Sequence, residues 1–243
     1  MIRHRIDYDR SAAGGFGARR TAINFDAPYL KKLTINFNPM TTESPHALNT
    51  DRVRIINEQT LANDWHTLKK TTFDFRRNDG EWQRQSRETY DRGNGATILL
   101  YNLARQTVVL IRQFRLPTFV NDYHGFLIET PAGLLENASP EARIKAEVEE
   151  ETGFQITDVH PIFSAFMSPG SVTERVHFFV AQYESKLRVS EGGGLEHEGE
   201  DIEVLEPTIE SALAMIESGE ICDGKTIMLL QYAALHVFAR IEK

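Results

Sequence analysis

The sequence of 243 residues predicts an α/β fold of the α+β type, with a mixed β-sheet and helices packed on it. Three observations predict this class. β-rich runs dominate the first half of the patterned region, a helical segment follows them, and after two more β-rich runs the chain closes with two helical segments. The sequence has neither the βαβαβ alternation of a doubly wound sheet nor an internal repeat.

The strands are recognised by runs of β-branched and aromatic residues. The run TTFDFRR is followed by a polar turn at Asp79 and Gly80, which predicts a hairpin because Gly permits the positive φ that tight turns need. Further strands are expected over residues 96–101, 107–112, 126–129, 162–167 and 177–183.

The helices are recognised by their ends and by apolar spacing. Ser139 is a natural N-cap, Pro140 suits the first helical position, and Gly153 is typical of the residue after a helix end, so a helix is predicted between them. Two later helices are predicted from apolar residues at helical spacing, which are Ile209, Ala212, Leu213 and Ile216, then Ile227, Leu230, Ala234 and Val237.

The chain is expected to have three parts. Residues 1–39 carry seven basic and three acidic side chains without sustained periodicity. They predict a disordered arm, or a gene start assigned too far upstream, with Met40 as the true initiator. Residues 40–90 are expected to form a small N-terminal β region, and residues 91–243 the main domain.

The overall composition excludes several classes. The formal net charge is -8, and residues 40–243 hold 20 basic and 32 acidic side chains, which argues against a nucleic-acid partner. The sequence contains neither an apolar run of about 18 residues for a membrane span nor a secretory signal at its start. Cys222 is the only cysteine, which excludes an internal disulfide and a Cys-based zinc site. A cytoplasmic protein without a membrane partner is expected.

Acidic residues cluster on the helix predicted after Ser139. Glu147, Glu150 and Glu151 stand at i, i+3 and i+4, so they share one side of that helix. Close carboxylates in partial burial repel each other, and Mg²⁺ or Mn²⁺ would relieve the repulsion. The alternative is an ordinary exposed Glu-rich turn, and the spacing alone leaves it open.

The wider context of this helix carries a resemblance to a known family. The stretch LIETPAGLLENASPEARIKAEVEEETGF resembles the box of the Nudix hydrolases, G-x5-E-x7-R-E-U-x-E-E-x-G-U, where U is apolar. Six residues match its second half: Glu147, Val148, Glu150, Glu151, Gly153 and Phe154. Its first half departs from the pattern. Gly133 is one residue nearer the helix, the early Glu falls on Ala138 or Ser139, and the Arg falls on Ala146, for which Arg143 or Lys145 could substitute.

Other segments extend the resemblance from about Arg52 to the C-terminus. They are RGNGAT (92–97), the segment ending at Arg115, SPGSVTE (168–174), the acidic stretch 196–206 and DGKT (223–226). Together they are similar to the ADP-ribose and nucleoside-diphosphate-sugar branch of the family, and within it most similar to the GDP-mannose pyrophosphatase group.

The resemblance implies a Nudix fold, with the mixed sheet sandwiched between helices. It implies hydrolysis of the diphosphate of a nucleoside diphosphate sugar, first of all GDP-mannose to GMP and mannose 1-phosphate. Two alternatives remain: an ADP-ribose pyrophosphatase, and a non-catalytic Nudix-fold sensor of nucleotide sugars, which Ala138 and Ala146 motivate. A homodimer is also implied, in which the N-terminal β region pairs with the partner subunit.

The resemblance also assigns site residues. Two or more Mg²⁺ ions, or Mn²⁺, are expected on the carbonyl of Ala132 and on Glu147, Glu150, Glu151 and Glu200. The catalytic residues are expected among Glu150, Glu198 and Glu200, and the choice of the base stays open. The residues expected to bind the substrate are Arg92, Arg115 and Glu129.

One short motif competes with this interpretation. Residues 219–226, GEICDGKT, satisfy the phosphate-loop pattern of NTPases. A phosphate loop follows a buried strand, whereas the residues before Gly219 have helical spacing, and two acidic residues within the motif would oppose a phosphate. We therefore predict that Gly219 ends one helix and that Asp223 caps the next.

Overall fold

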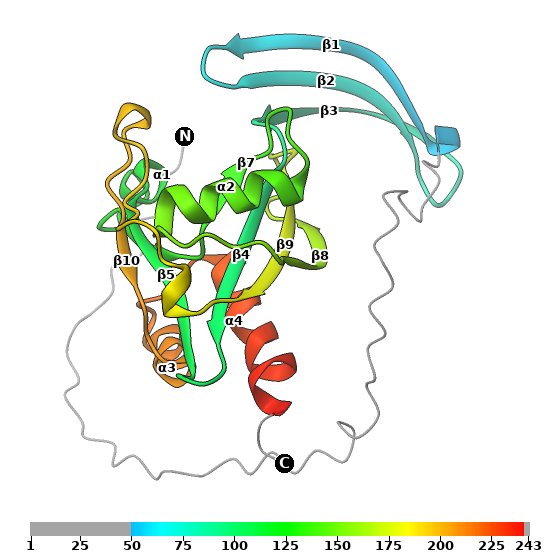
Figure 1. Ribbon diagram of the computed structural model, residues 1–243. Coiled ribbons are helices and arrows are strands. Elements are labelled where there is room, and N and C mark those ends of the chain that lie inside the picture. The colour runs from blue at the N-terminus through cyan, green and yellow to red at the C-terminus, as the bar shows by residue number, and fades with distance from the viewer. Residues whose placement is uncertain (1–49, 241–243) are drawn as a thin grey trace, which may run out of the picture. The chain divides into compact units, whose positions relative to one another are not determined.

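The computed structural model describes residues 50–240 (Figure 1). The predictions of an arm over residues 1–39 and of a start at Met40 lie outside the described residues. None of the helices within the described range has both the length and the apolar character needed to cross a membrane.

The described chain consists of strands with four α-helices between and after them. The strands are β1 (Val53–Asn63), β2 (Thr67–Arg76), β3 (Trp82–Asp91), β4 (Gly95–Asn102), β5 (Thr107–Phe114), β6 (Phe126–Glu129), β7 (Ala132–Leu134), β8 (His160–Phe166), β9 (Arg175–Gln182) and β10 (Glu203–Leu205). The helices are α1 (Leu116–Phe119), α2 (Pro140–Thr152), α3 (Ile209–Ser218) and α4 (Gly224–His236).

Strands β1, β2 and β3 form a three-stranded antiparallel sheet. The predicted hairpin is confirmed as β2 and β3, and Gly80 in its turn has a φ of +91°. β1 was not predicted as a separate strand, since its sequence, VRIINEQTLAN, lacks a regular alternation.

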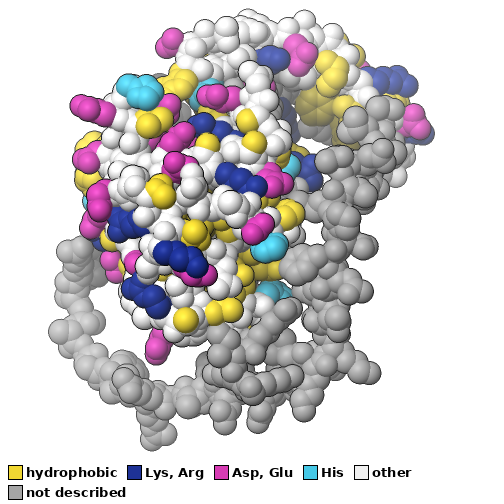
Figure 2. Space-filling view, viewed as in Figure 1, with side chains coloured by type: hydrophobic (Ala, Val, Ile, Leu, Met, Phe, Trp, Pro, Cys, Tyr) yellow, Lys and Arg dark blue, Asp and Glu magenta, His cyan; other side chains and the backbone are white. Residues whose placement is uncertain are grey.

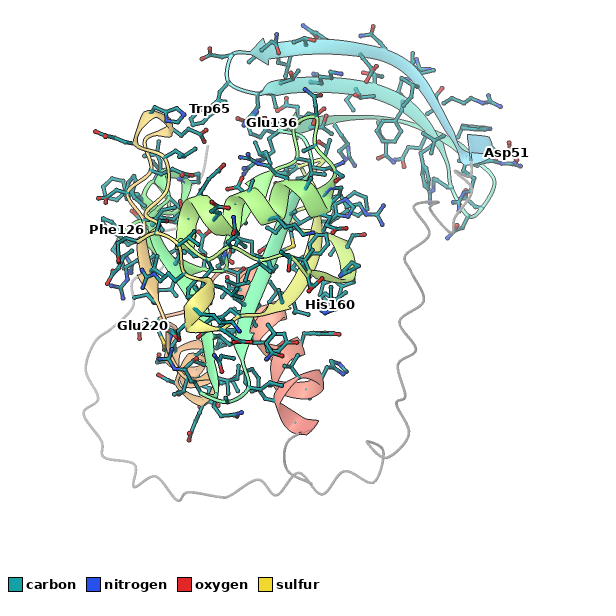
Figure 3. All side chains as sticks on the ribbon, in the orientation of Figure 1. Asp51, Trp65, Phe126, Glu136, His160 and Glu220 are labelled. Atoms are coloured by element: carbon teal, nitrogen blue, oxygen red, sulfur yellow. The ribbon has the colours of Figure 1, made fainter. Side chains whose placement is uncertain are left out.

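Apolar side chains of this small sheet are exposed. β1 is exposed along its whole length and β3 along most of it, and Figure 2 shows hydrophobic side chains on its surface. Trp65, in the turn between β1 and β2, is 88% exposed (Figure 3). The other exposed apolar residues are Val53, Ile55, Ile56, Leu61, Trp82 and Tyr90. A three-stranded sheet with so little burial is marginal by itself.

The larger sheet has seven strands, in the order β10-β5-β4-β9-β8, with β6 paired to β5 and β7 paired to β4. β4 and β9 run parallel, and the other pairs are antiparallel. The predicted mixed sheet is therefore confirmed. β7, β10 and α1 were not predicted, because three or four residues are too few to display a period.

Helices cover both faces of the seven-stranded sheet, which confirms the predicted sandwich. Successive residues of β4 serve opposite faces, as the pleat requires. Ile98 and Leu100 pack in one buried cluster with Ile144 and Val148 of α2. Leu99 packs in the other cluster, with residues of α3 and α4 that include Ile209, Ala212, Leu229, Leu230 and Ala233.

The predicted helix ends are confirmed. The Ser139 hydroxyl accepts a hydrogen bond from the Ala142 N–H at 3.2 Å, and Gly153 ends α2 with a φ of +76°. Gly219 ends α3 with a φ of +81°.

The phosphate-loop reading fails in the structure. Asp223 caps α4 by accepting from the Thr226 N–H at 3.0 Å. The motif GEICDGKT thus connects two helices instead of a buried strand and a helix, so the context that a phosphate loop needs is missing.

Two glycines that end helices allow a matched test of packing. Both have positive φ, so an Ala at either is strained by about 1–2 kcal/mol. A Cβ on Gly219 would meet nothing within 4 Å, whereas a Cβ on Gly153 would lie 2.0 Å from the Ser190 carbonyl oxygen. We expect Gly153→Ala to lower the free energy of unfolding, measured by urea denaturation, clearly more than Gly219→Ala does. Equal losses would contradict the close docking of the Ser190 segment on α2.

Candidate functional site

Helix α2 carries two carboxylates into the protein interior. Glu147 is 4% exposed and Glu151 is 1% exposed, while Glu150 is half-buried and Glu149 faces solvent. The helical period accounts for this pattern, because residues four apart lie on the same side. The alternative of an ordinary exposed Glu-rich turn does not fit this burial.

Each buried carboxylate has one close partner. Glu147 forms an ion pair with the Arg143 guanidinium, at 2.5 Å between Oε1 and Nη2. Glu151 accepts a hydrogen bond from the backbone N–H of Ala132 at 3.2 Å, which ties α2 to the start of β7. Of the two cations considered as substitutes for the family's Arg, Arg143 contacts Glu147, whereas Lys145 pairs with the exposed Glu141.

Gly133 gives the Glu147 side chain its space. A Cβ on Gly133 would lie 1.5 Å from Glu147 Oε1, and its φ is not in the left-handed region. The requirement for Gly at this position is therefore steric: the carboxylate occupies the place of the missing methyl group.

The second acidic segment docks on the C-terminal end of α2. The N–H groups of Gly193 and Gly194 donate to the carbonyls of Glu151 and Glu150, at 3.0 and 3.1 Å. These bonds satisfy carbonyls that a helix end leaves free. Glu200 follows in the same segment, where its carboxylate accepts from the Leu195 N–H at 2.9 Å.

The electrostatics of α2 show that this segment lies close to the buried carboxylates. Burial raises the pKa of Glu147 to about 7, Arg143 opposes the rise, and the charges of Glu150, Glu200 and Glu198 add to it. Burial, Glu147 and Glu200 raise the pKa of Glu151 well above its usual range. Four of the predicted site carboxylates therefore interact with Glu147 or lie beside it on α2.

This arrangement suits a hard divalent cation. Among residues 50–240, no three His, Cys, Asp or Glu side chains form a ready-made metal-binding group. The expected donors are nevertheless all oxygen atoms, from carboxylates and the Ala132 carbonyl, and Mg²⁺ prefers oxygen ligands. The raised pKa values of Glu147 and Glu151 reflect burial first and the charges of neighbouring carboxylates second, and a bound cation would offset both.

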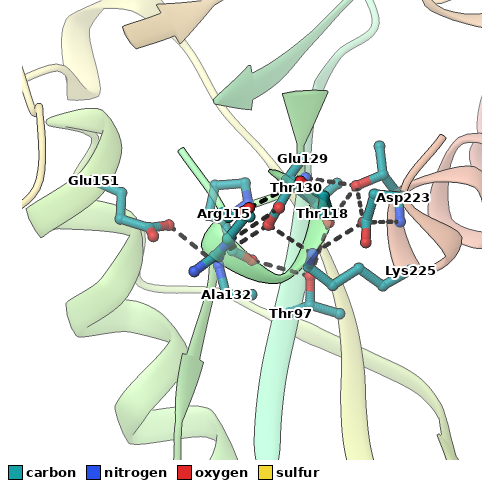
Figure 4. A network of polar contacts seen from close by, with 11 residues as sticks. Thr97, Arg115, Thr118, Glu129, Thr130, Ala132, Glu151, Asp223 and Lys225 are labelled. Atoms are coloured by element: carbon teal, nitrogen blue, oxygen red, sulfur yellow. Dashed lines mark hydrogen bonds and ion pairs between the residues drawn. The ribbon is translucent and has the colours of Figure 1, made fainter. Parts of the chain in front are cut away.

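A second buried ionic network lies beside the first (Figure 4). The Arg115 guanidinium makes a bidentate pair with Glu129, at 3.0 and 2.9 Å. Lys225 at the start of α4 donates to the same carboxylate at 2.8 Å. Arg115 also interacts electrostatically with Glu151, so the two networks are adjacent.

The structure brings together only some of the predicted substrate residues. Arg115 and Glu129 are in direct contact, and Arg115 lies near Glu151. Arg92 instead pairs with Glu174 at 3.6 Å. Glu129 is 1% exposed and both of its oxygens are engaged. Contact of Arg92 or Glu129 with a substrate stays a prediction.

Sequence reasoning missed Lys225 as a member of this site. The residue was considered only within the DGKT segment of the resemblance and the phosphate-loop motif, and its partner Glu129 lies 96 positions away in the sequence. The glycine run before Glu200 could have indicated that this segment packs closely against α2. Gly192, Gly193 and Gly194 all have positive φ, and a Cβ on Gly192 would lie 2.6 Å from the Glu151 carbonyl oxygen.

The raised pKa of Glu147 predicts a pH dependence for chelator-treated protein. Its folded pKa of about 7 exceeds the ordinary value of 4.5, so between these values the folded state binds more protons than the unfolded state. The free energy of unfolding should therefore fall as pH rises from 4.5 to 7, by on the order of 3 kcal/mol from this residue.

Urea denaturation at pH 5 and pH 8 measures this difference. Glu147→Gln removes the titrating group and should shrink the difference. Glu129 does not interfere, because its pKa is lowered to about 2, below the window. A difference that is the same in wild type and Glu147→Gln would contradict the assignment.

Comparison with known proteins agrees with this fold and site. Residues 91–219 match the NUDIX domain, and residues 52–90 match the GDP-mannose pyrophosphatase NudK N-terminal domain. The GDP-mannose pyrophosphatase of Escherichia coli O139:H28 is 53% identical over 184 residues, which cover 75% of this chain and 95% of the relative. The GDP-mannose pyrophosphatase of Citrobacter koseri is 52% identical with the same coverage.

A solved structure is similar in fold. The ADP compounds hydrolase superposes with a TM-score of 0.59 at 18% sequence identity, covering 78% of this chain and 96% of that chain. The domain match spans more than half of the chain, and the resemblance found in the sequence is confirmed. The chain belongs to the Nudix hydrolase family.

Proposed function

We propose that this protein hydrolyses the diphosphate of GDP-mannose to GMP and mannose 1-phosphate. The observation that carries the proposal is the identity of 53% to a GDP-mannose pyrophosphatase, across 95% of that relative. In the reaction a water oxygen bonds to one phosphorus, while the bond from that phosphorus to the bridging oxygen breaks. We place the reaction in the cytoplasm, where the single Cys222 suits reducing conditions.

The carboxylates around α2 would hold the divalent cations, Mg²⁺ or Mn²⁺. Glu147 and Glu151 would be the main ligands, with Glu150, Glu200 and the Ala132 carbonyl as further donors. The burial of Glu147 and Glu151 and their raised pKa values support this assignment. Bound there, two or more ions would neutralise the diphosphate and acidify a water molecule.

Side chains of the protein would supply the remaining chemistry. The Arg115 guanidinium would bind the diphosphate, because its planar donors match phosphate oxygens. Glu150, Glu198 or Glu200 would accept the proton of the attacking water. The electrostatic influence of Glu198 and Glu200 on Glu147 supports their closeness to the reaction.

We further propose that residues 40–90 form a dimerisation region and residues 91–243 the catalytic domain. The apolar side chains exposed on β1 and β3 support the first part, because a sheet that buries so little needs a covering partner. In a homodimer this sheet would pair with the partner subunit.

The substrate is tested with a panel of nucleotide sugars and ADP-ribose in the presence of Mg²⁺. We expect GDP-mannose to be hydrolysed fastest, with GMP and mannose 1-phosphate as products on chromatography. Glu151→Gln should lower turnover by about two or more orders of magnitude, because metal-assisted water activation is lost.

Three outcomes of the panel would change the proposal. Preference for ADP-ribose would favour the alternative of an ADP-ribose pyrophosphatase. Binding of GDP-mannose without any turnover would favour the sensor. Near-normal turnover by Glu151→Gln would place the metal site elsewhere.

Gly133 provides a test of how precisely Glu147 must be held. Gly133→Ala displaces the Glu147 carboxylate, which is the end of a flexible side chain, so the fold should tolerate the change. We expect kcat on GDP-mannose to fall by about tenfold or more with little change in the melting temperature. The matched control is Gly170→Ala, where a Cβ would meet nothing within 4 Å. Equal activity of both variants would refute a role for the Glu147 position.

A further inference from the structure

The buried carboxylate of Glu129 has an unusual environment for a residue beside a hydrolytic site. It is 1% exposed, it lies at the end of β6, and two cations share it. Burial by itself would raise the pKa of Glu129, but the charges and hydrogen bonds of Lys225 and Arg115 outweigh burial and lower it to about 2. Glu129 is therefore ionised at neutral pH.

The pair between Glu129 and Arg115 fixes the direction of the guanidinium. Nε donates to one carboxylate oxygen at 3.0 Å and Nη2 donates to the other at 2.9 Å. A bidentate pair of this kind holds the planar group in a single orientation. It uses the edge formed by Nε and Nη2, so Nη1 carries donors turned away from Glu129.

The backbone of Arg115 is held as well. Its N–H donates to the Gly125 carbonyl at 2.7 Å, and its own carbonyl accepts from the Thr118 hydroxyl at 2.9 Å. The side chain is nevertheless 38% exposed, whereas that of Glu129 is 2% exposed. Arg115 can therefore reach a ligand, while Glu129 lies behind it.

Helix α4 fixes the other side of Glu129. Lys225 donates to Glu129 at 2.8 Å and pairs with Asp223 at 3.0 Å. Asp223 is also the N-cap of α4, and the Thr226 hydroxyl accepts from the Thr130 N–H at 2.8 Å. The residue after Glu129 is thus hydrogen bonded to α4, so the helix and the Glu129 carboxylate are held in place relative to each other.

We propose that Glu129 is a positioning residue, which orients the Arg115 guanidinium toward the diphosphate and does not touch the substrate itself. This inference rests on the proposed function, in which Arg115 binds that diphosphate. The alternative position for the guanidinium is near Glu151, with which it already interacts. By holding the Nε and Nη2 edge, Glu129 keeps Arg115 from turning onto that carboxylate.

A double-mutant cycle tests the inference. Glu129→Gln keeps the shape but replaces one acceptor by an amide NH₂ that would face a cation. We expect KM for GDP-mannose to rise by about tenfold or more while kcat changes by less than about threefold. In an Arg115→Ala background, Glu129→Gln should have almost no further effect on kcat/KM, because its action passes through Arg115.

The control is the same Glu→Gln change in another pair of Glu and Arg. Glu203 pairs with Arg112 at 2.8 Å between β10 and β5, and its side chain is 58% exposed. Glu203→Gln should leave KM and kcat unchanged.

Two outcomes would overturn the inference. The first is that the effects of Glu129→Gln and Arg115→Ala multiply, which would mean that Glu129 contacts the substrate independently. The second is an unchanged KM in Glu129→Gln. Failure of the proposed function is recognised separately, because wild-type protein would then not hydrolyse GDP-mannose.

A second variant covers the case in which Glu129→Gln does not fold. Glu129→Gln combined with Lys225→Met removes the buried anion together with its second cation, while Asp223 loses Lys225 but keeps its hydrogen bonds from the N–H and hydroxyl of Thr226. We expect this double variant to fold and to bind GDP-mannose at least about tenfold more weakly than wild type, measured by calorimetry in the presence of a chelator. Wild-type affinity in the folded double variant would refute the positioning role.

Discussion

The burial of two carboxylates on α2 is the constraint on which the rest of the site depends. Glu147 and Glu151 lie one helical turn apart and are almost fully buried, so each ionised form is costly without a nearby positive charge. Arg143, the Ala132 N–H and Arg115 each compensate part of this cost. The remaining cost appears as raised pKa values, and it makes the site receptive to a divalent cation.

Two buried glutamates in neighbouring elements show opposite electrostatics, and the difference separates their roles. Glu129 has two cations within 3 Å and a pKa of about 2, so its charge is satisfied in the fold itself. Glu151 has one backbone N–H as a partner, and burial together with the charges of Glu147 and Glu200 raises its pKa. Glu129, whose charge is compensated within the fold, suits a structural task. The carboxylate of Glu151 is not fully compensated, so it is available to a ligand.

Much of the fold could be predicted from signals within a few residues. Contacts between residues far apart in the sequence could not. The cap Ser139, the terminal Gly153 and the turn Gly80 act within a few residues, so α2 and the hairpin followed from the sequence. The buried carboxylates followed from helical periodicity and the family resemblance. The pair between Lys225 and Glu129 could not be predicted, because nothing in either local sequence encodes a contact across 96 positions.

The segment that imitates a phosphate loop illustrates why a motif needs structural context. Its Asp, Lys and Thr are all engaged, but in contacts that a phosphate loop does not make. Asp223 caps α4, Thr226 is bonded to Thr130 of the loop after β6, and Lys225 neutralises Glu129. The contacts of Thr226 and Lys225 join α4 to β6 and the residue after it, beside the carboxylates of α2. Helix α4 therefore packs into the network that holds Arg115, although the matched NUDIX region ends at residue 219.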